Sequence, residues 1–353
     1  MRNYRIQVIA GDGIGVEVTS CAMRVMEKAA EIYGFGMSFE EHDWGSEYYF
    51  RHGRMMPANA LDTLRAADAI LLGAVGHPDI PDHITLHGLL LPIRRGLDQY
   101  VNVRPAVLYP GVESPLKHFP PGEIDMVVIR ENTEGEYAPV GGFVHQNHAG
   151  EVAVQSAVFT RQGCERVIRY AFELAVKRNG KKRVTSITKS NAQAYGMVLW
   201  DRVFQSVARE FPEIETESLL VDAAAMNFVR RPQSFDVVAA SNLFGDILSD
   251  LSAIVAGSIG LAASANLDPS GRSPSLFEPV HGSAPDIAGR GIANPLAAIL
   301  CGSMLLDHVG QGAAGAAIEQ AVRRVLGGGA ARTPDLGGSS GSAEVRDAVI
   351  ACL

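Results

Sequence analysis

The chain has 353 residues, enough for one large or two ordinary domains. Hydrophobic residues make up 47% of it and charged residues 20%, a mixture that excludes wholesale disorder. The net charge of -8 argues against non-specific nucleic-acid binding, which needs a basic surface, but it allows an anionic small substrate that meets a local cluster of arginines.

The four cysteines are scattered, without C-x-x-C spacing, which argues against a disulfide framework and a structural zinc site and favours a reducing compartment. The first ten residues predict a strand and not a signal peptide. The longest apolar run, residues 296–306, is interrupted by Gly302 and Ser303 and is shorter than a bilayer span. We therefore expect a cytoplasmic protein with neither a membrane nor a nucleic acid as partner.

Strand-like runs alternate with amphipathic segments along the whole chain, which is typical of an α/β protein. Strands are predicted at residues 6–10, 69–72, 126–130, 184–188 and 237–240, and helices at 17–33, 164–178, 195–211 and 244–251. Residues 136–160 differ, because they are rich in Gly and His and then alternate apolar with polar residues. This segment predicts a hairpin or arm, and both a surface hairpin and an arm exchanged between subunits remain open.

The first strand leads into GDGIG, residues 11–15, and then into a helix. A glycine turn at a helix N-terminus suits an anion, because free N–H groups and the helix dipole point there. The dinucleotide-binding fingerprint needs its third glycine at position 16, where this chain has Val16. A tight turn that packs the helix on its strand explains the motif equally well, so we do not predict a Rossmann domain from it.

Two aspartates, Asp246 and Asp250, stand four apart in the helix predicted after strand 237–240. Both carboxylates then project from one helical face, where like charges repel unless a cation lies between them. Oxygen ligands favour magnesium or manganese. Solvated aspartates on an exposed face are the alternative, but α/β proteins place ligands after such strands. Asp222, after the apolar run 218–221, is a candidate third ligand.

Candidate substrate and proton-transfer residues also follow strands. Arg94, Arg95 and Arg104 lie close together and Arg130 ends a strand, which suits bidentate recognition of carboxylates, although each could equally be a salt-bridged surface arginine. Tyr137, in the ENTEGEY segment after Arg130, could act as an acid. Lys189 follows strand 184–188, and a lysine held near cations and a metal can serve as a base. A surface lysine is the alternative.

Together these segments resemble the β-decarboxylating dehydrogenases, the family of isocitrate, isopropylmalate and tartrate/D-malate dehydrogenases. The resemblance covers nearly the whole chain, and its most specific pieces are SNLFGDILSDL (residues 241–251) and FEPVHGSAPDIAGRGIANP (residues 277–295). It implies an α/β fold of the isocitrate/isopropylmalate dehydrogenase type, with two lobes, a discontinuous first domain and no Rossmann topology. Residues 1–103 and 255–353 would form the cofactor-side lobe, and residues 104–254 the metal and dimerisation lobe with its arm.

The resemblance also implies residue roles. Arg94, Arg104 and Arg130 would bind the substrate carboxylates, and Leu90 would lie where the family reads the variable group of its substrate. Asp246 and Asp250, with Asp222 from the partner subunit, would hold Mg²⁺ or Mn²⁺, while a potassium requirement is left open. Tyr137 would be the general acid and Lys189, from the partner subunit, the general base. NAD would be bound by Glu278, His281, Gly282, Ser283, Ala284, Asp286, Asn294 and Asn191.

These roles imply a homodimer with shared active sites that oxidises a small 2-hydroxy dicarboxylate. An acid at Asp286 would repel the 2′-phosphate of NADP, so NAD is expected. The stretches WGSEYY (residues 44–49) and HGRMMP (residues 52–57) resemble the tartrate/D-malate branch. Tryptophans are usual in that branch at the positions of His77 and His87, so the preferred acid can differ, although both histidines could merely line the pocket rim. Isopropylmalate or another diacid is the alternative substrate, and a non-catalytic regulatory subunit the remote one.

Overall fold

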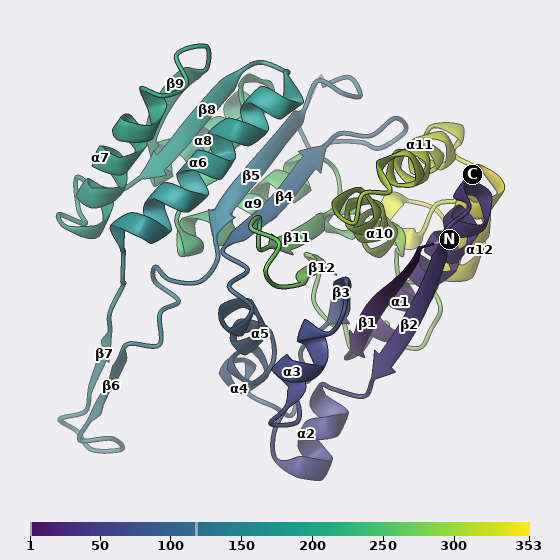
Figure 1. The fold of residues 1–353 in the computed structure, drawn as a ribbon, viewed down its shortest axis with the longest axis horizontal. Helices are drawn as coiled ribbons and strands as arrows, with labels where there is room; N and C mark the ends of the chain where they lie inside the picture. The colour runs from purple at the N-terminus through teal and green to yellow at the C-terminus, as the bar shows by residue number, and fades with distance from the viewer. Residues whose placement is uncertain (1, 117–118) are drawn as a thin grey trace. The chain divides into compact units, whose positions relative to one another are not determined.

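The computed structural model describes residues 2–116 and 119–353 of the chain, shown as a ribbon in Figure 1. The chain divides into two compact units. Unit 1 comprises Met1–Gln99, Arg104–Ile124 and Ala253–Leu353, and unit 2 comprises Tyr100–Val103 and Asp125–Ser252. Each unit is an α/β layer structure, as the alternation of strand and helix patterns predicts.

Unit 1 has five strands in the order β2-β1-β3-β12-β11, and only β11 and β12 pair antiparallel. The strands are β1 (Asn3–Gly11), β2 (Gly36–His42), β3 (Ala69–Ala74), β11 (Ala263–Leu267) and β12 (Ser275–Pro279). The helices are α1 (Gly15–Tyr33), α2 (Ser46–His52), α3 (Ala60–Arg65), α4 (Asp82–Gly88), α5 (Leu90–Gly96), α10 (Leu296–His308), α11 (Gly312–Gly328) and α12 (Ser342–Ala351), with short 3-10 turns at Ile259–Leu261 and Pro334–Leu336. Strand β4 (Val101–Val107) has residues in both units.

Helix α10 is apolar on all sides, which explains why the sequence has its longest apolar run there. It packs against α1, α11 and strands β11 and β12, and nine of its thirteen residues are buried. A helix buried on every side needs no amphipathic stripe. None of the helices in the described ranges combines the length and apolarity needed to cross a membrane.

Unit 2 has four strands in the order β5-β10-β8-β9, and each neighbouring pair is parallel. The strands are β5 (Asp125–Glu131), β8 (Arg183–Thr188), β9 (Glu215–Leu220) and β10 (Val237–Ala240). The helices are α6 (Arg161–Arg178), α7 (Gly196–Ala208), α8 (Val221–Arg230) and α9 (Asn242–Val255), with a 3-10 turn at Pro232–Ser234. Because the strands are parallel, their carboxyl ends meet at one edge, where α/β proteins bind ligands.

The segment predicted as a hairpin or arm is an antiparallel hairpin of β6 (Gly141–Val144) and β7 (Val152–Gln155). Every residue of the two strands is exposed, and the hairpin projects from the rest of unit 2 (Figure 1). Phe143 and Val154 are among its exposed apolar side chains. The hairpin is therefore confirmed, while its exchange between subunits stays a prediction.

The predicted elements agree with the structure except at some ends. Helix α9 begins at Asn242, two residues before the predicted start, because the N–H of Gly245 already donates to the carbonyl oxygen of Ser241 at 2.8 Å. Helix α6 begins at Arg161, since the Thr160 hydroxyl accepts the N–H of Gly163 at 2.9 Å and caps the helix.

The compact units differ from the expected lobes at residues 100–124. Residues 104–124 belong to unit 1, although we expected them in the middle lobe. The Ser114 hydroxyl donates to the carbonyl of Val255 at 2.7 Å, and the guanidinium of Arg323 lies 4.9 Å from the centre of the Tyr109 ring. These contacts tie the segment to the C-terminal part of unit 1.

The glycine loop at residues 11–15 has a packing role. A Cβ on Gly13, whose φ is +56°, would lie 2.0 Å from the carbonyl oxygen of Ser283, and one on Gly15 would lie 2.3 Å from that of Ala10. The N–H of Ile14 also donates to the carbonyl of Ser283 at 2.8 Å. Glycine is required here because the backbone approaches its neighbours so closely.

Candidate active site

The centre of the candidate site in unit 2 is Arg130, next to last in β5. Its side chain is only 2% exposed and forms an ion pair with Asp246 on α9. Its Nε and one terminal nitrogen both donate to Oδ1 of Asn242, at 3.1 and 2.7 Å. The register of the sheet explains this meeting, because Ala240 of β10 pairs with Arg130 and α9 begins two residues later.

A glycine lets the helix and the arginine come together. A Cβ on Gly245 would lie 2.6 Å from the Cβ of Arg130, a distance that real Cβ contacts essentially never show. Any larger residue at this position would push α9 away from β5. The glycine of the NLFGD segment therefore sets how closely Asp246 approaches Arg130.

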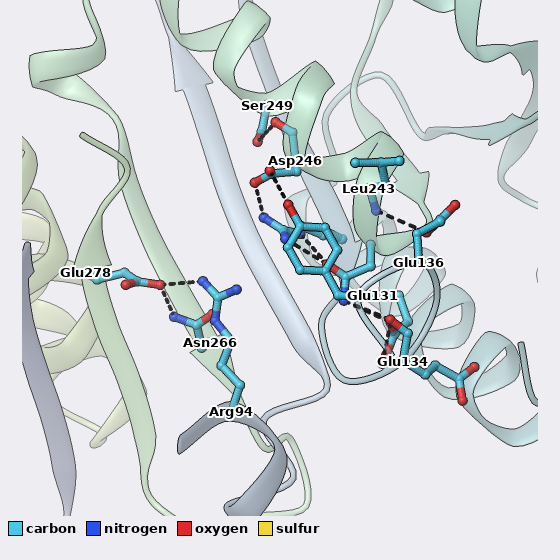
Figure 2. A network of polar contacts seen from close by, with 12 residues as sticks. Arg94, Glu131, Glu134, Glu136, Leu243, Asp246, Ser249, Asn266 and Glu278 are labelled. Atoms are coloured by element: carbon cyan, nitrogen blue, oxygen red, sulfur yellow. Dashed lines mark hydrogen bonds and ion pairs between the residues drawn. The ribbon is translucent and has the colours of Figure 1, made fainter. Parts of the chain in front are cut away.

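Tyr137 contacts the same carboxylate. Its hydroxyl donates to Oδ2 of Asp246 at 2.8 Å, and the Arg130 guanidinium lies 5.1 Å from the centre of its ring. Figure 2 shows Asp246 at the centre of these contacts. The structure thus brings together three predicted residues, a cation, a carboxylate and a phenol.

Three glutamates, one at the end of β5 and two in the loop after it, hold the Tyr137 loop in place, and the sequence did not predict this role. Glu131 accepts the N–H groups of Thr133 and Glu134, at 2.8 and 3.0 Å. Glu136 accepts the N–H of Leu243, at 3.2 Å, in the first turn of α9, where a negative charge is favoured (Figure 2). The third, Glu134, accepts the N–H and hydroxyl of Thr160, at 2.9 and 2.8 Å. Burial raises the pKa of Glu131, and the hydrogen bonds that it accepts from Thr133 and Glu134 oppose that rise.

Asp250 lies one helical turn after Asp246 on α9, as predicted, and is exposed. Within residues 2–116 and 119–353, no three His, Cys, Asp or Glu side chains gather as a metal site. One chain therefore does not bring Asp222 to the other two aspartates. Two carboxylates one turn apart supply hard oxygen donors of the kind that Mg²⁺ and Mn²⁺ prefer, so the residues present fit part of such a site.

Lys189 and Asp222 form a separate pair in unit 2. Lys189 directly follows β8, Asp222 lies in the first turn of α8, and the ammonium group donates to the carboxylate. The hydrogen bond from Lys189 lowers the pKa of Asp222. The Asp222 side chain is 59% exposed. The two residues that the resemblance assigns to the partner subunit are therefore neighbours, and Asp222 faces solvent.

Unit 1 contains a second buried arginine, Arg94 on α5. It donates to Oε1 of Glu278 on β12 at 2.7 Å, and the two side chains are only 4% and 6% exposed. Asn266 donates to the same oxygen at 2.8 Å (Figure 2). Arg104, on β4, is also buried. Leu90 packs into the hydrophobic cluster that contains Trp44, Met55 and Leu276, so it has a core role in this structure.

The predicted cofactor residues lie in different surroundings. Gly282, Ser283 and Pro285 line a cavity of about 550 Å³ together with residues 75–78 and 80–82. His281 Nδ1 lies 3.0 Å from the carbonyl oxygen of Gly282, and burial lowers the pKa of this histidine. Ala284 has a φ of +40°, in the left-handed region, and Asp286 is exposed.

Asn294 and Asn191 do not join that cavity lining. The Asn294 amide donates to Asp335 at 3.0 Å and its oxygen accepts the N–H of Leu296 at 3.0 Å, which fixes the start of α10. Asn191 is exposed and belongs to unit 2. Neither Asn266 nor Asn242 was predicted from the sequence. Asn242 follows the end of β10 by two residues, and this position is a signal that could have identified it.

Comparisons with known proteins place the chain in a family. A model of the isocitrate/isopropylmalate dehydrogenase family matches residues 5–349. A probable tartrate dehydrogenase/decarboxylase from Bacillus subtilis (strain 168) is 51% identical over 355 residues, covering 100% of this chain and 99% of the relative. A decarboxylating D-malate dehydrogenase from Escherichia coli (strain K12) is 51% identical over 356 residues, covering 99% and 98%.

The solved structures agree. The crystal structure of isocitrate dehydrogenase from Methylococcus capsulatus matches with a TM-score of 0.89 and 37% identity, over 99% of each chain. The protein belongs to the isocitrate/isopropylmalate dehydrogenase family. The family and fold expected from the two sequence motifs are thus confirmed, and relatives with tartrate and D-malate names match almost the whole chain.

Proposed function

We propose that the protein is an NAD- and divalent-metal-dependent enzyme that oxidises and decarboxylates a small 2-hydroxy dicarboxylate, D-malate or tartrate. The observation that carries this proposal is the meeting of Arg130, Asp246 and Tyr137 in unit 2. Relatives that are about half identical carry the names tartrate dehydrogenase/decarboxylase and decarboxylating D-malate dehydrogenase.

Each residue has a chemical role in this proposal. Arg94, Arg104 and Arg130 bind the carboxylates of the substrate, since a guanidinium matches a carboxylate with two parallel hydrogen bonds. Lys189 takes the proton of the 2-hydroxyl. Loss of carbon dioxide from the oxidised acid leaves an enolate, and the Tyr137 hydroxyl supplies the proton to its carbon.

Bound Mg²⁺ or Mn²⁺ supplies Lewis-acid polarisation of the hydroxyl, and NAD supplies the hydride acceptor. The carboxylates that would hold the cation are Asp246, Asp250 and Asp222. Residues 281–286 would hold the adenosine half of NAD, with Glu278 nearer the nicotinamide and Asn191 and Asn294 as further contacts. The exposed carboxylate of Asp286 favours NAD over NADP, because it repels a 2′-phosphate.

We further propose that the active unit is a homodimer with shared sites. One chain gathers only two of the three expected metal carboxylates, while Lys189 and Asp222 form an accessible pair of their own. Met226 on α8 and Ile247 on α9 expose apolar side chains, as does the β6–β7 hairpin. In a homodimer that shares its sites, these exposed apolar side chains would be covered by the partner subunit.

The test is NADH formation with a panel of acids, D-malate, tartrate, isopropylmalate and isocitrate, with and without Mn²⁺. We expect Mn²⁺-dependent turnover that is highest with D-malate or tartrate. Full activity after exhaustive chelation contradicts the metal role, and equal efficiency with NAD and NADP contradicts the role of Asp286. Highest efficiency with isopropylmalate replaces the proposed substrate with the alternative.

Lys189→Met separates the base from the rest of the site. We expect turnover to fall by orders of magnitude, because general acid–base catalysis contributes about 10²- to 10⁴-fold to the rate. NAD binding, measured by calorimetry, should be retained. Lys177→Met, at a surface position near the end of α6, is the control. Near-normal turnover of Lys189→Met removes this lysine from the mechanism.

A further inference from the structure

Asn242 is a buried amide whose two ends meet opposite charges. It is 1% exposed, and its oxygen accepts two hydrogen bonds from the guanidinium of Arg130, at 3.1 and 2.7 Å. Two bonds from one guanidinium edge fix both the position and the plane of the group. The amide thus sets the direction in which the remaining terminal nitrogen of Arg130 points, toward Asp246.

The nitrogen end of the same amide holds the loop that carries Tyr137. It donates to the carbonyl oxygen of Glu134 at 3.1 Å and lies 3.5 Å from Oε2 of Glu131. The loop packs closely on this residue, since a Cβ on Gly135 would lie 3.1 Å from the Cβ of Asn242. One side chain therefore links the orientation of Arg130 to the placement of the Tyr137 loop.

The neutral charge of the amide matters as much as its shape. Arg130 is almost fully buried, where a second carboxylate beside Asp246 would cancel its positive charge. A carboxylate at position 242 would also face the buried acid of Glu131 and could not donate to the Glu134 carbonyl. An amide orients the guanidinium without placing a second negative charge beside it.

We infer that Asn242 is a positioning residue for acid recognition: it holds Arg130 oriented and charged, and so sets the affinity for the substrate carboxylate. The inference rests on the proposed function, in which Arg130 binds that carboxylate. It predicts an unusual order of variants. Asn242→Asp, which is nearly the same shape, should weaken acid binding more than Asn242→Ala, which deletes the whole amide.

The experiment measures dissociation constants for D-malate, tartrate and NAD by calorimetry, with KM and kcat, on the full-length protein in Mn²⁺. For Asn242→Asp we expect acid binding to weaken about 10- to 100-fold. The second carboxylate cancels the charge of Arg130, which is equivalent to losing one charge-assisted hydrogen bond between Arg130 and the substrate carboxylate. For Asn242→Ala we expect a smaller loss. NAD binding should stay within about twofold for both variants, because Arg130 binds the substrate carboxylate and is not one of the residues proposed to bind NAD.

Ser186→Ala is the matched control, because it removes a buried hydrogen bond of unit 2, from Trp200 at 2.9 Å, away from Arg130. We expect its acid affinity to equal that of the parent. A purely structural role for Asn242 makes Asn242→Ala the more damaging variant and weakens NAD and acid binding together, and that result overturns the inference. Equal acid affinity of Asn242→Asp and the parent overturns it as well.

Two outcomes separate this inference from the proposed function. A parent protein that binds the acids but forms no NADH contradicts the proposed function, while the calorimetric order of variants still tests Asn242. A parent that binds none of the acids overturns both. If Asn242→Asp fails to fold, Asn242→Ser replaces it: serine is too short to accept both guanidinium bonds, so we expect acid binding about tenfold weaker with NAD binding unchanged, and unchanged acid binding overturns the inference.

Discussion

Arg94 in unit 1 and Arg130 in unit 2 are both buried arginines, but they are paired in different ways. Arg94 and Glu278 are both almost completely buried, with side chains 4% and 6% exposed. Arg130 is buried to the same degree, but its partner Asp246 is 33% exposed and also accepts a hydrogen bond from Tyr137. We call the first pair closed, because both side chains are shielded from solvent, and the second pair open, because its carboxylate reaches solvent.

This difference indicates what each pair can do without rearrangement. A desolvated pair costs free energy to break, since the charge that remains is buried without a partner. A carboxylate that reaches solvent can add a cation or a ligand while its arginine stays in place. We therefore expect Asp246 to dominate catalysis and Glu278 to dominate stability.

The largest effect is expected for Asp246→Asn. Removal of this carboxylate should lower kcat about 10³-fold, because Lewis-acid catalysis supplies several kcal/mol and each 1.36 kcal/mol is a factor of ten. The midpoint of denaturant unfolding should change little, since the side chain is one-third exposed. NADH formation across a range of Mn²⁺ concentrations measures the change.

The exposed surface acid Asp43 provides the control, as Asp43→Asn removes only a surface ion pair with Arg51. Its kcat should match that of the parent. Turnover of Asp246→Asn within tenfold of the parent would show that this carboxylate is not a metal ligand and would remove the contrast between the two arginines.

The second effect is on stability. Glu278→Gln leaves Arg94 buried without its charge partner and should lower the free energy of unfolding by about 3–5 kcal/mol. Denaturant titration followed by circular dichroism measures this value. The surface pair of Asp62 with Arg65 gives the scale, since Asp62→Asn should cost less than about 1 kcal/mol. A loss that small for Glu278→Gln would mean that the Arg94 pair is not closed.

The sequence could predict this contrast only in part. Asp246, Asp250, Arg130 and Tyr137 follow strand ends or share a helical face, and these local patterns can be recognised along the chain. Glu278 is different: its contact with Arg94 joins residues 184 positions apart, and no local pattern records such a pairing. The sequence therefore predicted Glu278 as a cofactor residue and missed its buried arginine.

The fold shows the same limit. Local sequence patterns identified the centres of β5, β8, β10 and α9. The three strands are buried along nearly their whole length and appear as short strand-like runs, while apolar residues recur with helical spacing in α9. These patterns missed the first turn of α9, where the hydrogen bond of Gly245 to Ser241 decides the start. The compact units also differ from the expected lobes at residues 104–124, where the division depends on contacts with distant residues such as Val255. Hydrogen bonds between separate segments decide these points.

The third effect is a change in pH dependence at Glu131. Burial raises the pKa of this carboxyl above its ordinary value of 4.5, so the folded protein binds more protons than the unfolded chain in this range. The resulting stability is present below the ordinary pKa and is lost as pH rises through the raised pKa. The Gln side chain of Glu131→Gln cannot titrate, so this variant should lack the loss. In the parent the free energy of unfolding should fall with a slope of at most about 1.36 kcal/mol per pH unit from this group.

Denaturant midpoints measured from pH 4 upward test this sign, roughly one pH unit at a time across the range of carboxyl titration. The parent should lose stability with rising pH relative to Glu131→Gln, although the variant is less stable overall because a Gln amide cannot accept every N–H that the carboxylate accepts. Parallel curves, or a parent that gains stability with pH relative to the variant, would show that hydrogen bonds outweigh burial at this residue.

The smallest effect is expected for Asp286→Ala, because this acid is exposed and acts on the ligand through solvent. Removal of one exposed charge should raise kcat/KM with NADP about three- to tenfold, consistent with the modest energies of exposed charge interactions, and leave NAD nearly unchanged. Glu319→Gln on the surface of α11 should alter neither value. If both cofactors change by the same factor, Asp286 does not read the 2′-position, and the choice between NAD and NADP must depend on other residues around the cavity lined by Gly282 and Ser283.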